Sequence, residues 1–316
     1  MDDLTENGWN YSASRMYRLT VPATAAGRRL DQVLAELLPQ HSRNRLQAWI
    51  KAGAVRVDDR PRDEPKSRLA GGEELLVAAA PDNEVVAGQP EAIPLQVVYE
   101  DDALLVIDKP AGLVVHPGSG NWSGTLLNAL LHHAPQLEAV PRAGIVHRLD
   151  KDTSGLLVVA KRLETQTDLV RQLQARTVKR QYLAIACGRV EREGKVDAPL
   201  ARHPVHRTRM AVVSQGKPAV THYRVLERFA RCTLLECALE TGRTHQIRVH
   251  LASLGHPLLG DPVYGRTLPG LPTFPRQALH AARLGLIHPL SRLAMQWEAV
   301  LPDDLQQLLA SLRGIE

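Results

Sequence analysis

The sequence is poor in cysteine and has no long apolar run. Its three cysteines, Cys187, Cys232 and Cys237, form neither a CxxC pair nor the framework of a small disulfide-bonded domain. We therefore expect reduced thiols in a cytoplasmic protein. No stretch approaches the ~18 apolar residues of a membrane-spanning helix, and the N-terminal region lacks the apolar core of a secretory signal. We expect neither export nor a membrane anchor.

Positive charge exceeds negative charge in a chain that can still build a large core. Lys and Arg number 39 against 34 Asp and Glu, which gives a formal net charge of +5, with 13 His in addition. Such a balance favours polyanionic partners such as nucleic acid, although many mildly basic enzymes have none. The hydrophobic fraction of 44% excludes a disordered or fibrous chain, and 316 residues suffice for one large and one small domain.

Composition and periodicity divide the chain into four segments. Residues 1–15 are polar and without pattern, and we expect a disordered N-terminus. Residues 16–79 predict a small domain with two helices followed by short strands. Residues 80–93, rich in Pro, Ala, Gly and acidic side chains, are typical of a linker. Residues 94–316 then form the large domain.

The small domain contains a basic helix. In "GRRLDQVLAELLPQ" apolar residues recur at helical spacing up to Pro39, and "HSRNRLQAWIKAG" predicts a second helix between Ser42 as N-cap and Gly53 as stop. "AVRVDDRP" and "EELLVAA" then predict strands, the first with an Asp-Asp turn. The polar face of the second helix presents three cations that we take as candidate RNA contacts: Arg43, Arg45 and Lys51.

The large domain has more strands than helices. "LQVVYEDDALLVIDKP" predicts two strands around an acidic turn, and further strands are expected in "KRQYLAIACGRV" and over residues 219–227 and 233–239. Helical spacing occurs in "GTLLNALLHHA" and over residues 163–176. Because there is no regular βαβ alternation, we expect an α+β fold with a mixed, largely antiparallel sheet.

A first charged cluster, "HRLDKD", directly precedes the apolar run from Leu156 to Ala160. In one interpretation it is a polar turn whose aspartates accept backbone hydrogen bonds. In the other, Asp150 is a nucleophile or general base held at the mouth of the sheet, and a carboxylate suits nucleophilic work at a glycosidic carbon. His147 and Arg148 lie beside it in the sequence.

A second cluster is "LETGRTHQIRVHLA". Gly242 permits a tight turn, Thr244 could cap the next segment, and residues 246–252 form a helix or an extended segment. The donors here are Arg243, His245, Arg248 and His250. A buried cation near Asp150 would lower the pKa of that carboxyl and keep it ionised, as a nucleophile requires. The alternative is a solvated basic face.

A third set of candidates comes from loops. In "KPAGLVVHPGSGN", glycines and prolines shape a loop in which His116 could contact a phosphate, although the Lys and Ser/Thr of a P-loop are absent. The strip "RHPVHRTRM" has no apolar periodicity and predicts an RNA-facing loop with Arg207 and Arg209, or else a solvated loop. His245 and His250 are five residues apart, which does not fit a helical metal site, and we expect no metal.

Three long motifs in a fixed order now resemble a known family. "GIVHRLDKDTSGLLVVAK", then "KRQYLA", then "LETGRTHQIRVHLA" closely resemble the RluA-type pseudouridine synthases, and residues 28–77 resemble the S4 RNA-binding module. The resemblance implies isomerisation of uridine in RNA: the N1–C1′ bond breaks, the uracil turns, and C5 bonds to C1′. Because substrate and product are isomers, it implies no cofactor.

The resemblance also assigns residues. It implies Asp150 as the catalytic aspartate and Arg148 as the residue that fills the space left by the flipped nucleotide. Tyr182 in "KRQYLA" matches the tyrosine that packs on the base, and Arg248 matches the basic partner of the aspartate. Ile247 and Val249 are expected to line the pocket. Extrusion of the base is physically necessary, because a stacked base hides its glycosidic bond.

Within the family, "VVHPGSGN", "GKPAVTHYRV" and "GDPVYG" are most similar to members that act on large-subunit ribosomal RNA. The implied partner is 23S ribosomal RNA or a precursor large ribosomal subunit, with uridines in the stem-loop called helix 69 as targets and a monomeric enzyme. Three alternatives stay open: another ribosomal or transfer RNA site, an RNA chaperone in ribosome assembly, and an N-glycosylase that hydrolyses the same bond.

Overall fold

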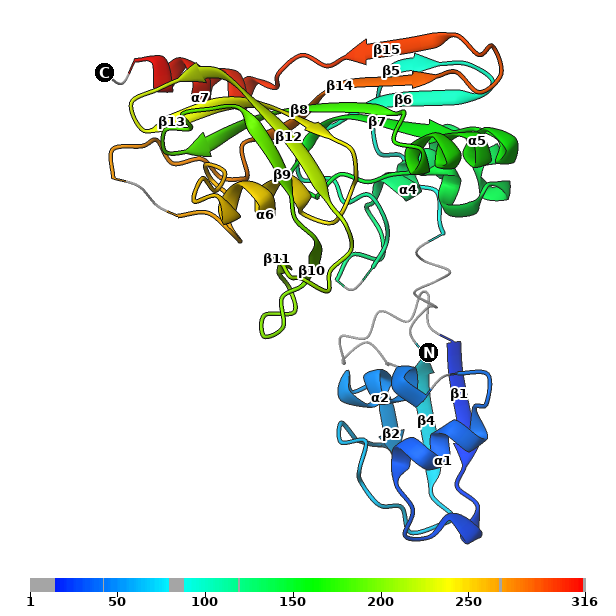
Figure 1. The fold of residues 1–316 in the computed structure, drawn as a ribbon. Helices are drawn as coiled ribbons and strands as arrows, with labels where there is room; N and C mark the ends of the chain where they lie inside the picture. The colour runs from blue at the N-terminus through cyan, green and yellow to red at the C-terminus, as the bar shows by residue number, and fades with distance from the viewer. Residues whose placement is uncertain (1–14, 42, 80–87, 119, 267–268, 315–316) are drawn as a thin grey trace, which may run out of the picture. The chain divides into compact units, whose positions relative to one another are not determined.

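The computed structural model describes residues 15–41, 43–79, 88–118, 120–266 and 269–314. The chain forms two compact units, residues 1–86 and 87–316 (Figure 1). Most of the expected disordered N-terminus 1–15 and of the expected linker 80–93 lies outside the described residues. Each unit has its own apolar core.

The N-terminal unit packs two helices on a small antiparallel sheet. The helices are α1 (Leu30–Leu37) and α2 (Arg43–Lys51), after a short 3-10 helix η2 (Ala23–Ala25). The sheet has the order β1-β4-β2-β3, with β1 (Arg15–Thr20), β4 (Glu74–Ala79), β2 (Val55–Val57) and β3 (Arg60–Pro61). Both predicted helices are confirmed, and the proposed cap Ser42 lies outside the described residues.

Two local predictions in this unit are explained by backbone geometry. Asp58 and Asp59 both have positive φ, 47° and 58°, and join β2 to β3 as the expected two-residue turn. Such turns match the twist of the strands they connect, and Asp tolerates this conformation. Gly53, at φ 72°, ends α2 by donating its amide to the carbonyl of Ile50.

The C-terminal unit is built on a nine-stranded sheet. Its order is β5-β6-β7-β14-β8-β13-β12-β9, with β15 pairing with β14. The strands are β5 (Gln96–Glu100), β6 (Leu104–Lys109), β7 (Ser154–Ala160), β8 (Lys179–Cys187), β9 (Gly194–Asp197), β12 (Val220–Arg228), β13 (Cys232–Leu239), β14 (Leu279–Ile287) and β15 (Ala294–Glu298). All pairings are antiparallel except that of β14 with β7. The expected mixed, largely antiparallel α+β fold is therefore confirmed.

Helices cover both faces of this sheet (Figure 1). On one face, α4 (Leu126–His133) and α6 (Gln246–Ser253) pack on alternate residues of β6, β7 and β8. On the other, α5 (Leu163–Gln174) and α7 (Asp303–Arg313) cover the remaining positions. Two 3-10 helices, η3 (Pro135–Ala139) and η4 (Pro141–Gly144), join α4 to the segment before β7.

The "RHPVHRTRM" strip is more ordered than expected. Its ends belong to β10 (Leu200–Arg202) and β11 (Met210–Val212), which pair as an antiparallel hairpin. The prediction of a loop is therefore wrong at both ends, because three-residue strands without an apolar period give no clear sequence signal. The residues between the two strands form the exposed tip.

Among the described residues, no helix is both long and apolar enough to cross a bilayer.

Candidate active site

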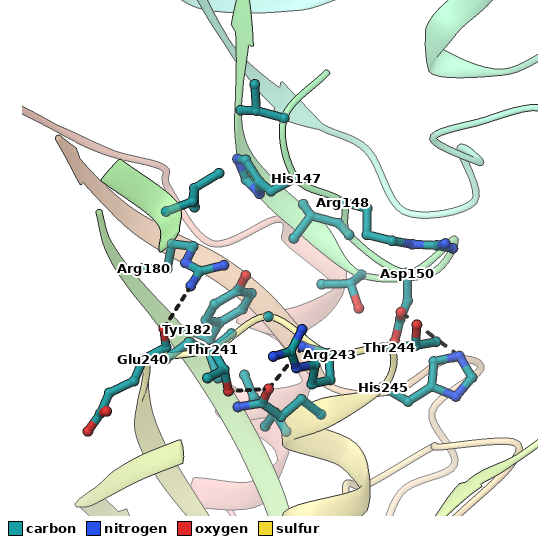
Figure 2. Close-up of a pocket in the computed structure, with 18 of the residues that line it drawn as sticks. His147, Arg148, Asp150, Arg180, Tyr182, Glu240, Thr241, Arg243, Thr244 and His245 are labelled. Carbon is teal, nitrogen blue, oxygen red and sulfur yellow. Dashed lines mark hydrogen bonds and ion pairs between the residues drawn. The ribbon is translucent and has the colours of Figure 1, made fainter. Parts of the chain in front are cut away.

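A pocket of about 550 Å³ opens on the face of the sheet that carries α6 (Figure 2). It is lined by residues of the segment 142–153, by the C-terminal end of α5 with Arg176, by β8, by the turn after β13 and by the first turn of α6, together with Leu279 of β14. A volume of this size suits a small ligand such as a nucleotide. Positive charge dominates the lining, which has two carboxylates, Asp150 and Glu240, against six arginines: Arg142, Arg148, Arg176, Arg180, Arg243 and Arg248.

Asp150 and Arg248 form an ion pair at the centre of this lining. Nη1 of Arg248 donates to Oδ2 of Asp150 at 2.9 Å. The other edge of the guanidinium makes two bonds to Asp261, from Nε at 2.7 Å and from Nη2 at 2.9 Å. Asp261 in turn accepts the backbone amides of Val263 and Tyr264. A two-bond contact fixes the guanidinium plane, so Asp261 aims Arg248 at Asp150.

The charges in this triad stabilise one another away from water. Burial lowers the pKa of the Arg248 guanidinium, but its bonds to Asp261 and the charge of Asp150 outweigh that effect and raise it. Burial acts oppositely on the Asp261 carboxyl, yet Arg248 holds its pKa below the usual range. Arg248 is therefore a permanent cation beside Asp150.

His245 and Tyr264 close the other side of the triad. His245, at φ 55°, precedes the first residue of α6. Its Nδ1 lies 2.9 Å from the Tyr264 hydroxyl, and its Nε2 lies 3.9 Å from Oδ1 of Asp150. Burial lowers the pKa of His245 although the Asp150 charge raises it. The expectation that Thr244 caps this helix is wrong, because His245 holds the N-cap position and makes no side-chain cap bond.

β8 contributes Tyr182 and Arg180. They are two residues apart on one strand, and both are buried and line the pocket, where Figure 2 shows them close together. Burial raises the pKa of the Tyr182 hydroxyl, and the charge of Asp150 acts in the same direction. Tyr182 therefore stays neutral and presents an aromatic surface to the pocket.

Two buried side chains from other segments hold the turn that carries Asp150. Lys109, fully buried at the end of β6, donates its ammonium to the carbonyls of Pro110 at 2.7 Å, Leu113 at 2.9 Å and Lys151 at 2.9 Å. Burial lowers the pKa of Lys109 to about 7, and the nearby aspartates oppose this shift. Arg276 donates to the carbonyl of Asp152 at 3.0 Å. These bonds hold the backbone of the two residues that follow Asp150 in place.

The pocket also shows why the segment before Asp150 contains a glycine. Gly144 has φ 75°, and a Cβ there would lie 1.9 Å from the carbonyl oxygen of Ala160. Arg142 and Ala143 precede it with φ of 58° and 49°. This left-handed run lets the chain pass directly against β7 before it turns into the pocket.

Three more of the expected site residues differ in how they lie relative to the pocket. Arg148 lines the pocket, is exposed and points away from Tyr182 in Figure 2. Ile247 is buried and lines the pocket as expected. Val249 does not line it, because it packs with Leu200 and Ala219 in a separate cluster. The prediction for Val249 is therefore wrong: alternate positions on a helix face opposite directions.

His147 and His116 are partly buried rather than displayed. Nε2 of His147 accepts the backbone amide of Val158 at 3.2 Å, and burial lowers its pKa to about 3. His116 accepts Nε of Arg142 at 3.3 Å, and burial lowers its pKa to about 4. Neither histidine can offer a full positive charge to phosphate near neutral pH.

The remaining basic candidates lie at the surface. Arg243 lines the pocket and donates to the carbonyl of Pro218 at 3.1 Å. Arg207 and Arg209 lie at the tip of the β10–β11 hairpin. In the N-terminal unit, Lys51 is exposed at the end of α2 and the Arg45 guanidinium lies 5.4 Å from the Trp49 ring.

Arg43 has a structural partner of its own. It donates to the fully buried Asp31 at 2.8 Å, and Arg29 and Gln47 bond to the same carboxylate. Arg43 therefore joins α2 to α1, whatever else its half-exposed side chain contacts.

Four residues of the site were not identified from the sequence: Lys109, Arg180, Asp261 and Tyr264. Asp261 and Tyr264 lie in "GDPVYG", where a carboxylate and an aromatic residue between two glycines are a usable signal. Lys109 and Arg180 have no such signal, because their burial depends on contacts between distant segments. Within the described residues, no cluster of three or more His, Cys, Asp or Glu could hold a metal ion.

Comparisons with known proteins identify the family of this chain. The family of RNA pseudouridylate synthases matches residues 103–253, and the S4 domain matches residues 28–75. The ribosomal large subunit pseudouridine synthase D of Nitrosomonas europaea is 60% identical over 98% of this chain and 95% of its own. The protein of the same name from Neisseria meningitidis serogroup B is 54% identical over 93% of this chain and 81% of its own.

Solved structures extend the likeness to the catalytic unit. Human RNA pseudouridylate synthase domain containing 1 has a TM-score of 0.53 and 27% identity, over 71% of this chain and 96% of its own. Human RNA pseudouridylate synthase domain containing 4 gives a TM-score of 0.54 and 27% identity, over 69% and 93%. The chain therefore belongs to the RNA pseudouridylate synthase family, and an S4 RNA-binding domain precedes its catalytic domain.

Proposed function

We propose that this enzyme converts uridines of 23S large-subunit ribosomal RNA to pseudouridine, with several targets in the helix 69 stem-loop. The support for the substrate is the name shared by relatives with 54% to 60% identity across most of the chain. The observation that carries the chemistry is the Asp150 carboxylate, held at 2.9 Å by the buried Arg248 in a pocket beside Tyr182.

In the proposed reaction Asp150 attacks C1′ of the target uridine, and the N1–C1′ bond breaks. Because two bonds to Asp261 fix the plane of Arg248, its third bond orients one carboxylate oxygen of Asp150 toward Arg248 and leaves the other for the sugar. Tyr182 packs on the uracil while it turns. C5 then bonds to C1′, the carboxylate leaves, and the C5 proton is lost to a base.

The target must leave the RNA stack to reach Asp150, because the pocket lies beneath the surface. Arg148 is exposed at the pocket rim and its planar guanidinium suits the vacated space in the RNA. The S4 domain and the arginines at the tip of the β10–β11 hairpin are proposed to contact phosphates, and this contribution should weaken as salt rises.

The direct test uses RNA tritiated at uridine C5. Asp150→Asn should abolish tritium release while RNA affinity changes little, because the amide cannot act as a nucleophile. Arg224→Met, which removes a surface ion pair with Glu236 on β12 and β13, serves as the matched control and should release tritium normally. An active Asn variant would refute the role of Asp150.

Pseudouridine mapping in cells with and without the gene tests the substrate. Loss of pseudouridine in the helix 69 loop supports the proposal, whereas loss elsewhere assigns another RNA. Release of free uracil in vitro would indicate an N-glycosylase. Rescue of a deletion strain by Asp150→Asn would indicate that RNA chaperone activity is what the cell requires.

A further inference from the structure

Arg180 is a buried guanidinium in the catalytic pocket. Its exposed fraction is 7%, and it lies on the same face of β8 as Tyr182. Within the described part of the chain it makes one long hydrogen bond, from Nη2 to the carbonyl of Glu240 at 3.4 Å, and its Nε has no partner there. Burying an unbalanced charge costs free energy, so the presence of Arg180 inside a pocket points to a ligand that balances its charge.

No carboxylate near Arg180 compensates it among the residues that the structure describes. The Glu240 carboxylate, which follows β13, is already bonded to Arg176 at 2.7 Å and to His222 at 2.7 Å. Asp150 is bonded to Arg248. The positive charge of Arg180 nevertheless acts on its neighbours, because it lowers the pKa of both His147 and Tyr182, although burial has the larger effect on each.

The proposed reaction moves one negative charge across this pocket. Before reaction the charge is on Asp150, beside Arg248. When C1′ bonds to the carboxylate and the N1–C1′ bond breaks, the bonding electron pair passes to N1 of the uracil and spreads over O2 and O4. Arg248 cannot follow that charge, because two bonds to Asp261 hold its guanidinium in place.

We propose that Arg180 stabilises the negative charge on the departing uracil. This inference rests on the function proposed above and adds a catalytic residue to it. Arg180, Tyr182 and Asp150 all line the pocket, and Figure 2 shows Arg180 and Asp150 on opposite sides of the Tyr182 ring. A uracil packed on Tyr182 therefore lies within reach of Arg180 on one side and of Asp150 on the other. A fixed cation in a water-poor pocket is most effective where charge develops in the transition state.

Gly242 supports this placement. A Cβ at residue 242 would lie 2.6 Å from Nη1 of Arg180, so glycine leaves room for the guanidinium. Its backbone does not require glycine, since its φ lies outside the left-handed region. Gly242→Ala can therefore displace the Arg180 head without removing its charge or straining the turn.

The test changes how readily the uracil leaves as an anion. Fluorine at C5 withdraws electrons and makes uracil a better leaving anion, so its departure should depend less on Arg180. Single-turnover rates of target-nucleoside consumption are measured on matched RNAs carrying uridine or 5-fluorouridine, with RNA affinity measured separately. Arg180→Met should slow the uridine reaction by about 100-fold, the usual effect of one such donor, and the 5-fluorouridine reaction by a clearly smaller factor.

Three variants separate charge from packing. Arg180→Lys keeps a cation and should recover part of the rate, Gly242→Ala should show the same leaving-group pattern with a smaller loss, and Arg224→Met should match the wild type on both RNAs. Thermal unfolding of each variant checks the fold. Equal losses on both RNAs, or an Arg180→Met enzyme of wild-type rate, would overturn the proposal for Arg180. A wild-type enzyme that consumes neither nucleoside would instead overturn the proposed function.

Discussion

At the scale of single residues, the arrangement around Arg248 explains how the carboxylate of Asp150, the proposed nucleophile, is held in one orientation within the pocket. The guanidinium offers two parallel bonds to Asp261 on one edge and a single bond to Asp150 on the other. Asp261, which has no chemical role in the proposed reaction, is held by more bonds than Asp150: its side chain is fully buried and two backbone amides are further donors to it.

Removing the charge of Asp261 should reduce both stability and reaction rate, although Asp261 does not contact the sugar in the proposed reaction. We predict that Asp261→Asn lowers the free energy of unfolding by about 3 kcal/mol, because it leaves a buried guanidinium poorly paired, and also slows single-turnover pseudouridine formation. Urea unfolding and rate measurements check this. Glu236→Gln, which breaks surface pairs with Arg224 and Arg283, should cost less than about 1 kcal/mol. Similar losses in both variants would contradict the role of Asp261.

Substitutions at two positions of α6 should distinguish a residue that lines the pocket from a residue that only packs in the core. Val249→Ala should reduce stability by about 2 kcal/mol, since it removes two buried methyl groups, while leaving the turnover rate per folded enzyme unchanged because Val249 packs with Leu200 and Ala219. Ile247→Ala should change the apparent KM and the rate, since Ile247 lines the pocket. Denaturant unfolding and steady-state kinetics of both variants test these two expectations. A rate defect in Val249→Ala alone would contradict this division.

At the scale of elements, the end of β6 and the turn before β7 act together. Lys109 joins them through three carbonyl groups, and the three donors of an ammonium match three acceptors. The loop 110–113 and the turn that carries Asp150 are therefore one unit built around one side chain.

Lys109→Met keeps the aliphatic stem but removes the donors. We predict a loss of about 3 kcal/mol in unfolding free energy, because buried carbonyls are left without partners, together with a slower reaction owing to a looser Asp150. Chemical denaturation and single-turnover kinetics measure the two effects. Lys151→Met is the control, since its own side chain is exposed and only its carbonyl takes part. An unchanged rate in Lys109→Met would show that Asp150 is positioned without it.

In the N-terminal unit, Asp31 is the corresponding buried acceptor. It joins α1 and α2 through Arg43 and Gln47 and is fully buried. Asp31→Asn should weaken that unit by about 3 kcal/mol and leave the C-terminal unit protected, as hydrogen exchange resolved by residue would show. Loss of protection across β7 and β8 would contradict the independence of the two cores. Asp59→Asn, in an exposed turn, provides the control.

At the scale of the whole molecule, buried neutral histidines should make the catalytic unit sensitive to acid. His280 on β14 is fully buried, and burial lowers its pKa to about 4. The folded state therefore binds fewer protons than the unfolded state between pH 6.5 and about 4. Stability from this group is complete above pH 6.5 and is lost as the pH falls through that window.

The size of this effect can be measured. Between pH 6.5 and about 4, His280 should account for roughly 3 kcal/mol of the decline in unfolding free energy. His280→Gln should flatten the decline, whereas His132→Gln, at an exposed position of α4, should leave it unchanged. Denaturant unfolding across this pH range supplies the comparison. A curve for His280→Gln that is parallel to the wild type would contradict the assignment.

The fold class and the pair of Asp150 and Arg248 could both be predicted from the amino-acid sequence. Alternating and helical apolar spacing are local properties, so the strands β5, β6, β8, β12 and β13 and both helices of the N-terminal unit could be predicted. Asp150, Tyr182 and Arg248 were identified because each lies in a motif of the chain. β14 and β15 were not, although β14 lies at the centre of the sheet.

The side chains that complete the site come together only when distant segments of the chain pack against one another. Asp261 lies 13 residues beyond Arg248 in the sequence yet holds it with two bonds, and Lys109 reaches a carbonyl 42 residues away. Arg180 is buried because β13 and the turn at Gly242 cover it in the folded chain. Burial removes water from an arginine or lysine side chain, so its charge then requires a hydrogen-bonding or ionic partner. Burial in turn depends on packing between segments that are distant in the sequence.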